Sequence, residues 1–272
     1  MSLSTETIKS RVSVRTFDNR KVPESVIEQI KKYIDQIDNP FHIPIEFQIL
    51  DTKEYVLRSP VIIGAGAYAA AKYKKVPNAE IAFGYAFEKF ILYAASLGLG
   101  TVWLAATIDR RAFEKAIGLK QDEVMPAVSP LGYAAEKRSA REILMRKAMK
   151  SDERLPFEKL FFKGDFQHPM KESEAGRLLL PLQMLRLSPS ATNKQPWRVA
   201  ADGNRVHFYE EKTKGYAKEG MGDIQKVDLG IAICHFEIGA DEQGLKGRIV
   251  QNDPGITISD NTEYIATYES EN

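Results

Sequence analysis

Cysteine is nearly absent from the 272-residue sequence, which contains only Cys234. A single cysteine can form neither a disulfide framework nor a cysteine-rich metal site, and this scarcity is typical of proteins that reside in the cytoplasm. Histidine is also scarce, and the four histidines do not have the spacing of metal ligands. We therefore expect a cytoplasmic protein without a bound metal ion.

Long apolar runs and a surplus of either charge are also missing. The most apolar stretch, residues 60–71, is shorter than the roughly 18 residues that a membrane span requires, and it contains glycines. The polar N-terminus, residues 1–6, has no apolar signal segment. The 38 basic and 37 acidic residues leave a net charge of +1, whereas a general nucleic-acid binder needs a basic excess to neutralise phosphates. We therefore expect neither a membrane nor a nucleic acid as a partner.

Hydrophobic periodicity predicts a mixture of helices and strands. Residues 79–97 are apolar on nearly all sides, which indicates a helix deep in the core, and Gly98 is a residue type that ends helices. Further helices are predicted at residues 23–38, 109–118, 139–150, 172–187 and 228–243, with a kink or break at Pro181. Strands are predicted at residues 45–49, 60–63, 101–105, 124–133, 197–201 and 205–209. This mixture predicts an α+β fold.

Two local features are interpreted as structural. The helix at residues 139–150 begins with Ser139 and Glu142, which have the spacing of a capping box, and its basic residues predict a solvent-facing surface. Gly64 and Gly66 follow a predicted strand but lack the third glycine of a dinucleotide-binding fingerprint. We interpret these glycines as sites of close backbone packing.

The two halves of the sequence match each other at a fixed offset. The matching residues are small or apolar, have helical spacing and end in a glycine: Gly84, Ala86, Phe90, Ala94, Gly98 and Leu99 match Gly230, Ala232, Phe236, Ala240, Gly244 and Leu245. The offset is 146 in every pair, from 230 − 84 to 245 − 99. Chance is the alternative, because core helices share these residue types, but one ungapped offset favours an internal duplication. We expect residues 1–160 and 161–272 to be two intertwined halves of one globular unit, a pseudo-dimer.

The first motif with chemical content is the stretch Arg11-Val12-Ser13-Val14-Arg15. If it is extended, the two arginines and the serine share one side, which suits a phosphate dianion. An exposed edge strand with two solvated arginines would have the same sequence, so this motif is weak by itself.

The second motif is Ser188-Pro189-Ser190-Ala191-Thr192-Asn193-Lys194-Gln195-Pro196-Trp197. Its two prolines stiffen a loop that offers hydroxyl and amide groups at defined positions, so it could hold a flat polar heterocycle and its sugar-like tail. An ordinary connection between a helix and a strand, anchored by Trp197, is the alternative.

Together these motifs resemble the nitroreductase family of FMN flavoproteins. The family's Arg-x-Ser-Val-Arg-x-Phe stretch matches residues 11–17, and its Pro-Ser-x-x-Asn-x-Gln-Pro-Trp stretch matches residues 189–197. The helix end at residues 94–100, the stretch 101–104 and Leu131-Gly132-Tyr133 also match. The resemblance implies a nitroreductase-like fold that covers most of the chain.

The order of the motifs departs from the usual family pattern. In ordinary members both motifs lie near the N-terminus of one subunit, and each flavin lies between two subunits of an intertwined homodimer. Here Asn39-Pro40-Phe41-His42-Ile43-Pro44 stands where the second motif should follow the first, and the second half has no arginine motif. The chain therefore resembles the double-length, single-chain subgroup, in which one flavin site survives and a monomer is sufficient to form it.

The resemblance also implies roles for individual residues. Arg11, Ser13 and Arg15 would hold the FMN phosphate and ribityl chain, and the backbone of Leu104, Ala105 and Ala106 would lie near flavin N5 and O4. The residues on the other side of the flavin would be Pro189, Ser190, Ala191, Asn193 and Gln195. A further basic residue would contact the cofactor, and Arg138, Arg141 and Arg154 are the candidates.

The activity that the resemblance implies is hydride transfer from NADH or NADPH, through FMN, to an electron-poor small molecule such as a nitroaromatic or a quinone. No catalytic side chain is assigned, because the cofactor carries the chemistry. A flavin-binding or degenerate protein without efficient turnover is the first alternative, and a scaffold without flavin is the second.

Overall fold

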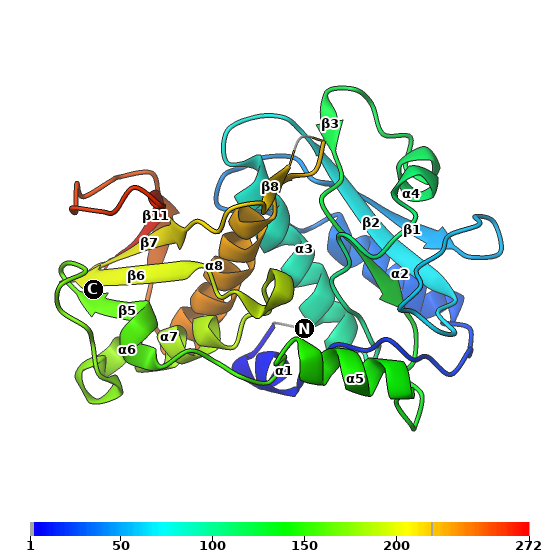
Figure 1. The fold of residues 1–272 in the computed structure, drawn as a ribbon, viewed down its shortest axis with the longest axis horizontal. Helices are drawn as coiled ribbons and strands as arrows, with labels where there is room; N and C mark the ends of the chain where they lie inside the picture. The colour runs from blue at the N-terminus through cyan, green and yellow to red at the C-terminus, as the bar shows by residue number, and fades with distance from the viewer. Residues whose placement is uncertain (1–2, 219, 272) are drawn as a thin grey trace.

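The computed structural model describes residues 3–218 and 220–271. Its centre is a pair of long helices, α3 (Ala79–Ser96) and α8 (Ile224–Glu242), which pack against each other between two sheets (Figure 1). Both helices are buried on most sides, as expected for helices that are apolar nearly all round. Asp223 caps the N-terminus of α8, and its side chain accepts a hydrogen bond from Gln225 N–H.

The first sheet is antiparallel and belongs to the first half of the chain. It contains β1 (Glu46–Asp51), β2 (Ala67–Lys74), β3 (Glu123–Val124) and β4 (Val128–Leu131), with β2 paired to each of the others. Besides α3, the α-helices between residues 3 and 150 are α1 (Thr5–Ser10), α2 (Glu24–Ile34), α4 (Arg110–Ala116) and α5 (Ala140–Ala148).

The strands of the second sheet all belong to the second half. Its order is β10-β11-β7-β6-β5, and only the pair β5-β6 is parallel. The strands are β5 (Phe161–Lys163), β6 (Trp197–Asp202), β7 (Arg205–Glu211), β10 (Gly247–Val250) and β11 (Thr262–Ser270). The remaining elements are α6 (Phe157–Leu160), α7 (Leu179–Arg186), the short strands β8 (Ala217–Lys218) and β9 (Gly222–Asp223), and three single turns of 3-10 helix at Glu172–Glu174, Gly176–Leu178 and Ala191–Asn193.

The two sheets have the same connections. In each half an antiparallel strand pair leads into a core helix, β1-β2-α3 and β6-β7-α8, and a later strand, β4 or β11, pairs with the second strand. After the core helix, Leu104 pairs with Val128 of β4, just as β10 pairs with β11. The segment 101–104 and β10 are 146 positions apart (247 − 101). The predicted α+β fold is confirmed. The matching order of strands and helices in the two halves is what a duplicated chain would show.

Several predicted elements are wrong in extent or place. Residues 60–63 are not a strand: Pro60 and Val61 form a turn, and only Ile63 makes an isolated bridge, with Thr16. In place of the predicted strand at 101–105 the structure has isolated bridges. In place of the predicted strand at 124–133 it has the two shorter strands β3 and β4. In the region 172–187 only α7 is an α-helix, and Pro181 lies in its first turn, where a proline removes no helical hydrogen bond. No kink is therefore needed at Pro181.

A search of the described ranges finds no helix that combines the length and the apolar character needed to cross a membrane.

Candidate functional site

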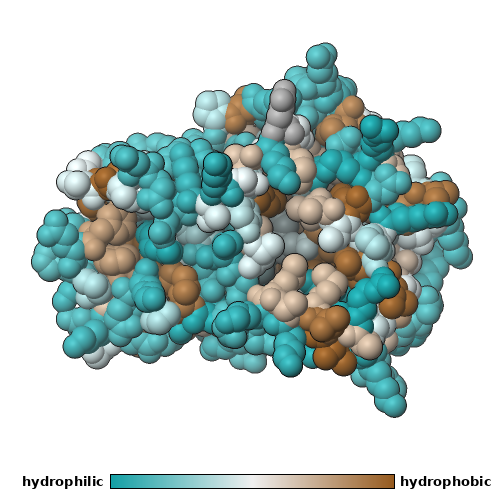
Figure 2. All heavy atoms as spheres, in the orientation of Figure 1, coloured by the Kyte–Doolittle hydropathy of each residue, from teal (hydrophilic) through white to brown (hydrophobic). Residues whose placement is uncertain are grey.

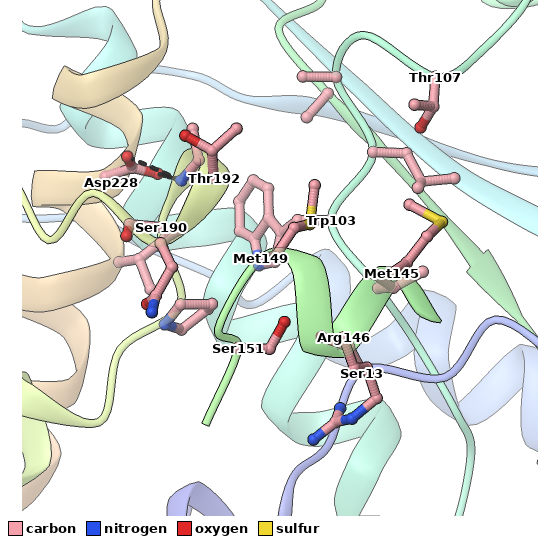
Figure 3. Close-up of a pocket in the computed structure, with 18 of the residues that line it drawn as sticks. Ser13, Trp103, Thr107, Met145, Arg146, Met149, Ser151, Ser190, Thr192 and Asp228 are labelled. Atoms are coloured by element: carbon pink, nitrogen blue, oxygen red, sulfur yellow. Dashed lines mark hydrogen bonds between the residues drawn. The ribbon is translucent and has the colours of Figure 1, made fainter. Parts of the chain in front are cut away.

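A cavity of about 280 Å³ lies where the two halves meet. Its walls come from segments far apart in the sequence: residues 11–15, residues 102–107, the loop 189–193, and the helices α5 and α8 with the turn after α5 (Figure 3). On the same face of the molecule, Figure 2 shows apolar residues gathered around a hollow near the middle. The motifs that the sequence separates by most of its length therefore face one another.

The arginine segment forms one end of the cavity. It is extended, because Ser13 makes a parallel bridge to Thr101 and Thr16 makes one to Ile63. The side chain of Arg11 is only 8% exposed, and Arg15 is equally buried. Within the described structure, Nε and Nη1 of both arginines have no hydrogen-bond partner. Buried donors without a partner cost free energy, so these four nitrogens suit a bound anion.

Two further arginines line the same cavity. Arg146 of α5 pairs with Asp152, and Arg154 donates from Nη2 to the Leu187 carbonyl at 3.1 Å, while its Nε has no partner among the described residues. Burial lowers the pKa of the Arg15 guanidinium; the Glu142 carboxylate partly offsets this, and Arg146 adds to it. Burial likewise lowers the pKa of Arg154, with Arg11 as a second cause. Together Arg11, Arg15, Arg146 and Arg154 form an arginine cluster that an anion would stabilise.

The loop 189–193 forms the opposite wall, and hydrogen bonds hold it in an unusual conformation. Thr192, Asn193 and Gln195 have positive φ angles of 49°, 57° and 52°. Such backbone costs about 1–3 kcal/mol per residue and persists only where the surroundings fix it. Ser190 Oγ accepts the Gln195 N–H at 2.9 Å, and the Asp228 carboxylate accepts the Ala191 N–H at 3.0 and 3.1 Å.

The stretch after α3 forms the floor of the cavity. Leu104 exchanges two backbone hydrogen bonds with Val128 of β4 at 2.9 Å, and Arg110 donates from Nη2 to the Ala105 carbonyl at 2.9 Å. The indole of Trp103 lines the cavity and donates from Nε1 to Glu88 Oε2 at 2.8 Å. This segment is therefore held by Val128, Arg110 and Glu88, which do not line the cavity.

Most of the residues that the sequence singles out come together here. The predicted site residues that line the cavity are Arg11, Ser13, Arg15, Leu104, Ala105, Ala106, Arg154, Pro189, Ser190, Ala191 and Asn193. Gln195 does not line it: its side chain is buried behind the loop, where Oε1 accepts the Leu155 N–H at 2.9 Å. Arg138, whose side chain is half exposed, pairs with the buried Glu142, and Arg141 donates to the Pro60 carbonyl. Of the three competing basic residues, only Arg154 lines the cavity.

Sequence reasoning missed the contribution of α5. Met145, Arg146 and Met149 of this helix and its C-terminal end line the cavity, so the prediction of a merely solvent-facing helix is wrong for this face. The two methionines are four positions apart, a spacing that indicates one helix face. The predicted capping box forms only in part, because Ser139 caps the helix while the Glu142 carboxylate accepts from Arg15 N–H and Thr16 Oγ1 instead.

Asp228 of α8 was also missed. Its carboxyl group is buried, and it lines the cavity beside the loop, as Figure 3 shows. Burial raises the pKa of this group well above its usual range, and the hydrogen bond from Ala191 N–H opposes the shift. The sequence alone does not reveal this role, because a single aspartate in an apolar helix has the same sequence pattern whether its side chain is buried or exposed.

The fold and this split cavity define a protein of the nitroreductase fold class. The chain belongs to the family described as putative TM nitroreductase, whose family model matches residues 4–240. The crystal structure of a putative nitroreductase from Thermotoga maritima is similar, with 21% identity, 99% of this chain and 94% of that chain covered, and a TM-score of 0.65. A putative NADH dehydrogenase/NAD(P)H nitroreductase from Methanothermobacter thermautotrophicus is 28% identical over 160 residues, which are 51% of this chain and 81% of that protein. The predicted family is therefore confirmed.

Proposed function

We propose that the cavity binds FMN and that the chain is an FMN-dependent oxidoreductase. It transfers hydride from NADH or NADPH, through FMN, to an electron-poor small molecule such as a nitroaromatic or a quinone. One observation carries the proposal: buried guanidinium nitrogens of Arg11 and Arg15 have no hydrogen-bond partner among the described residues, and both arginines line a cavity whose other wall is the loop 189–193. This pairing of motifs is the one that the family resemblance assigns to FMN.

The arginine cluster suits the phosphate of FMN. A phosphate dianion accepts several charge-assisted hydrogen bonds, and guanidinium groups supply them in pairs. Arg11, Ser13 and Arg15 would hold the phosphate, and Arg146 and Arg154 would add positive charge. The desolvation that lowers the pKa of Arg15 would be offset by the bound anion.

The rest of the cavity suits the ring system. Pro189, Ser190 and Asn193 line one side, and Leu104 and Ala105 line the other. When bound, FMN supplies the two-electron chemistry, while these residues orient it. Met145 and Met149 give the cavity an apolar wall that would exclude water from the reacting ring.

The donor assignment rests on a relative. The name of the similar Methanothermobacter protein includes both NADH and NAD(P)H, which supports a nicotinamide as the electron donor for this chain without selecting between the two forms. Location in the cytoplasm stays a prediction that rests on the scarcity of cysteine.

A second cavity supports the proposal of one flavin per chain and of a duplicated origin. Five of its lining residues are 146 positions from residues that line the first cavity: Ile43 and Pro189, Asn78 and Ile224, Trp103 and Ile249, Leu104 and Val250, Ala105 and Gln251. At the positions that correspond to Arg11 and Arg15 stand Phe157 and Phe161, which are buried with ring centroids 4.4 Å apart. This second cavity therefore has no counterpart of the arginine pair to hold a phosphate.

Two spectra test the proposal. Purified protein reconstituted with FMN should retain flavin absorbance after gel filtration, and the absorbance should bleach anaerobically on addition of NADH or NADPH. Bound flavin that neither nucleotide bleaches would favour the alternative of a flavin-binding protein without turnover. Failure to retain FMN would overturn the proposal in favour of a scaffold without flavin.

A further inference from the structure

A fully buried carboxylate lies beside the cavity, in the middle of α3. Glu88 is 0% exposed, and nitrogen atoms of three other side chains approach its carboxyl oxygens. Trp103 Nε1 lies 2.8 Å from Oε2, His235 Nε2 lies 2.9 Å from Oε1, and Arg11 Nε lies 3.9 Å from Oε1. Trp103 and Arg11 line the cavity, whereas His235 belongs to α8 in the other half.

The surroundings of His235 constrain its protons. Its ring is 0% exposed, and Nδ1 lies 3.2 Å from the carbonyl oxygen of Met184, which can only accept a hydrogen bond. Nδ1 must therefore carry a proton. Nε2 faces Glu88, so either Nε2–H donates to a carboxylate or a protonated Glu88 donates to Nε2.

The positive charge of Arg11, beside Glu88, decides between an ionised and a protonated Glu88. Arg11 is always charged, and its Nε lies within ion-pair distance of the same Oε1 that faces His235. An ionised Glu88 accepts the indole N–H and an imidazolium N–H and is an anion within ion-pair distance of Arg11, whereas a neutral acid would leave the buried Arg11 without that anion. The ionised form is thus the one that the contacts favour.

We infer that Glu88 is a positioning residue for the cavity. Ionised and paired with a doubly protonated His235, it fixes the Trp103 indole and the Arg11 guanidinium on the cavity wall and ties both to the helix of the other half. The contribution to FMN binding rests on the proposed function, whereas the charge assignment does not.

The substitution Glu88→Gln isolates this role. The amide oxygen can still accept the Trp103 N–H, but the amide nitrogen then faces His235 Nε2, which must become an acceptor. The change removes one negative charge and one proton of the imidazolium, so the net charge beside the arginines is unchanged. A change in FMN affinity would therefore not come from a change in the net charge beside the arginines.

Nitrogen-15 NMR of the histidine rings in the whole protein at neutral pH gives the first readout. The wild-type protein should show His235 with both ring nitrogens protonated, and E88Q should show an unprotonated Nε2. Glu237→Gln is the matched control, since Glu237 is a second largely buried acid of the core helices that does not line the cavity. It should leave the His235 signals unchanged. An unprotonated Nε2 in the wild-type protein would overturn the charge assignment even if E88Q fails to fold.

Flavin titration gives the second readout. E88Q should bind FMN about tenfold more weakly, the size of one charge-assisted hydrogen bond, and should bind riboflavin as the wild type does. Unchanged FMN affinity, or equal weakening of both ligands, would overturn the positioning role. A wild-type protein that binds no FMN would instead overturn the proposed function, and the histidine signals would still decide the charge of the pair.

Discussion

Gly84 of α3 and Gly230 of α8 make the same close contact with each other's helix. A Cβ atom on Gly84 would lie 2.0 Å from the Val227 carbonyl oxygen, and one on Gly230 would lie 2.0 Å from the Ile81 carbonyl oxygen. Both the glycines and their partners are 146 positions apart (230 − 84 and 227 − 81). Such reciprocal contacts are what a two-fold interface produces, so they support the proposed pseudo-dimer.

Alanine at either glycine should destabilise the protein. The neighbouring atoms are backbone carbonyls, so the helices must move apart, and overpacking of this kind costs about 1–3 kcal/mol or more. Urea unfolding of Gly84→Ala and Gly230→Ala measures the loss. Gly66→Ala is the control, because a Cβ there would meet nothing within 4 Å. Equal urea midpoints of unfolding for all three variants and the wild type would refute the close approach of α3 and α8 at these glycines.

Arg15→Ala should weaken FMN binding by about 1.5–3 kcal/mol and leave riboflavin binding much less affected, since the assigned contact is to phosphate. Fluorescence titration with both flavins measures the difference. Arg141→Ala serves as the control, because that side chain lies outside the cavity lining. If Arg15→Ala weakens FMN and riboflavin to the same extent, Arg15 does not bind the phosphate.

Arg146 of α5 should also contribute to FMN binding, although the sequence did not predict Arg146 as a site residue. Arg146→Ala should lower FMN affinity by about 1 kcal/mol or more, because a cation is lost from the arginine cluster. The neighbouring Lys147 is exposed and does not line the cavity, so Lys147→Ala removes the same charge one position away without the effect. Identical affinities for the two variants would show that α5 does not reach the bound cofactor.

Two largely buried acids should make contributions to the free energy of unfolding that decline as the pH rises from weakly acidic to neutral. Burial raises the pKa of Glu237 from 4.5 to about 7, so the folded state favours the protonated acid. This contribution is complete below pH 4.5 and is lost as the pH rises through about 7. Glu210, with a pKa also raised to about 7 by burial, contributes in the same direction.

Glu237→Gln isolates the first of these contributions. Between about pH 5 and about pH 8 its free energy of unfolding should fall less than that of the wild type, by on the order of 2 kcal/mol. Urea unfolding at both pH values measures the difference, and Glu210 keeps its own effect in both proteins. If the free energy of unfolding declined equally in the wild type and in Glu237→Gln, Glu237 would be ionised in the folded protein over the whole pH range.

The sequence predicts the parts of this molecule in which local chemistry and fold agree. The core helices, the β6-β7 hairpin and the meeting of the two motifs follow from apolar periodicity, a turn at Gly203 and the family resemblance. The strand β2 could not be found, because its alanines have little preference for strands and its place in the sheet depends on tertiary packing. Arg146 and Asp228 were missed since only the folded chain shows which face of α5 and α8 the cavity takes.

In the proposed FMN-dependent enzyme, one chain supplies both walls of a single FMN site. Sedimentation velocity at decreasing concentration, read at flavin absorbance and at protein absorbance, tests it directly. We expect one FMN for each chain, and we expect the flavin still to sediment with the monomer at the lowest concentration. Flavin released as oligomers dissociate, or two flavins for each chain, would contradict it.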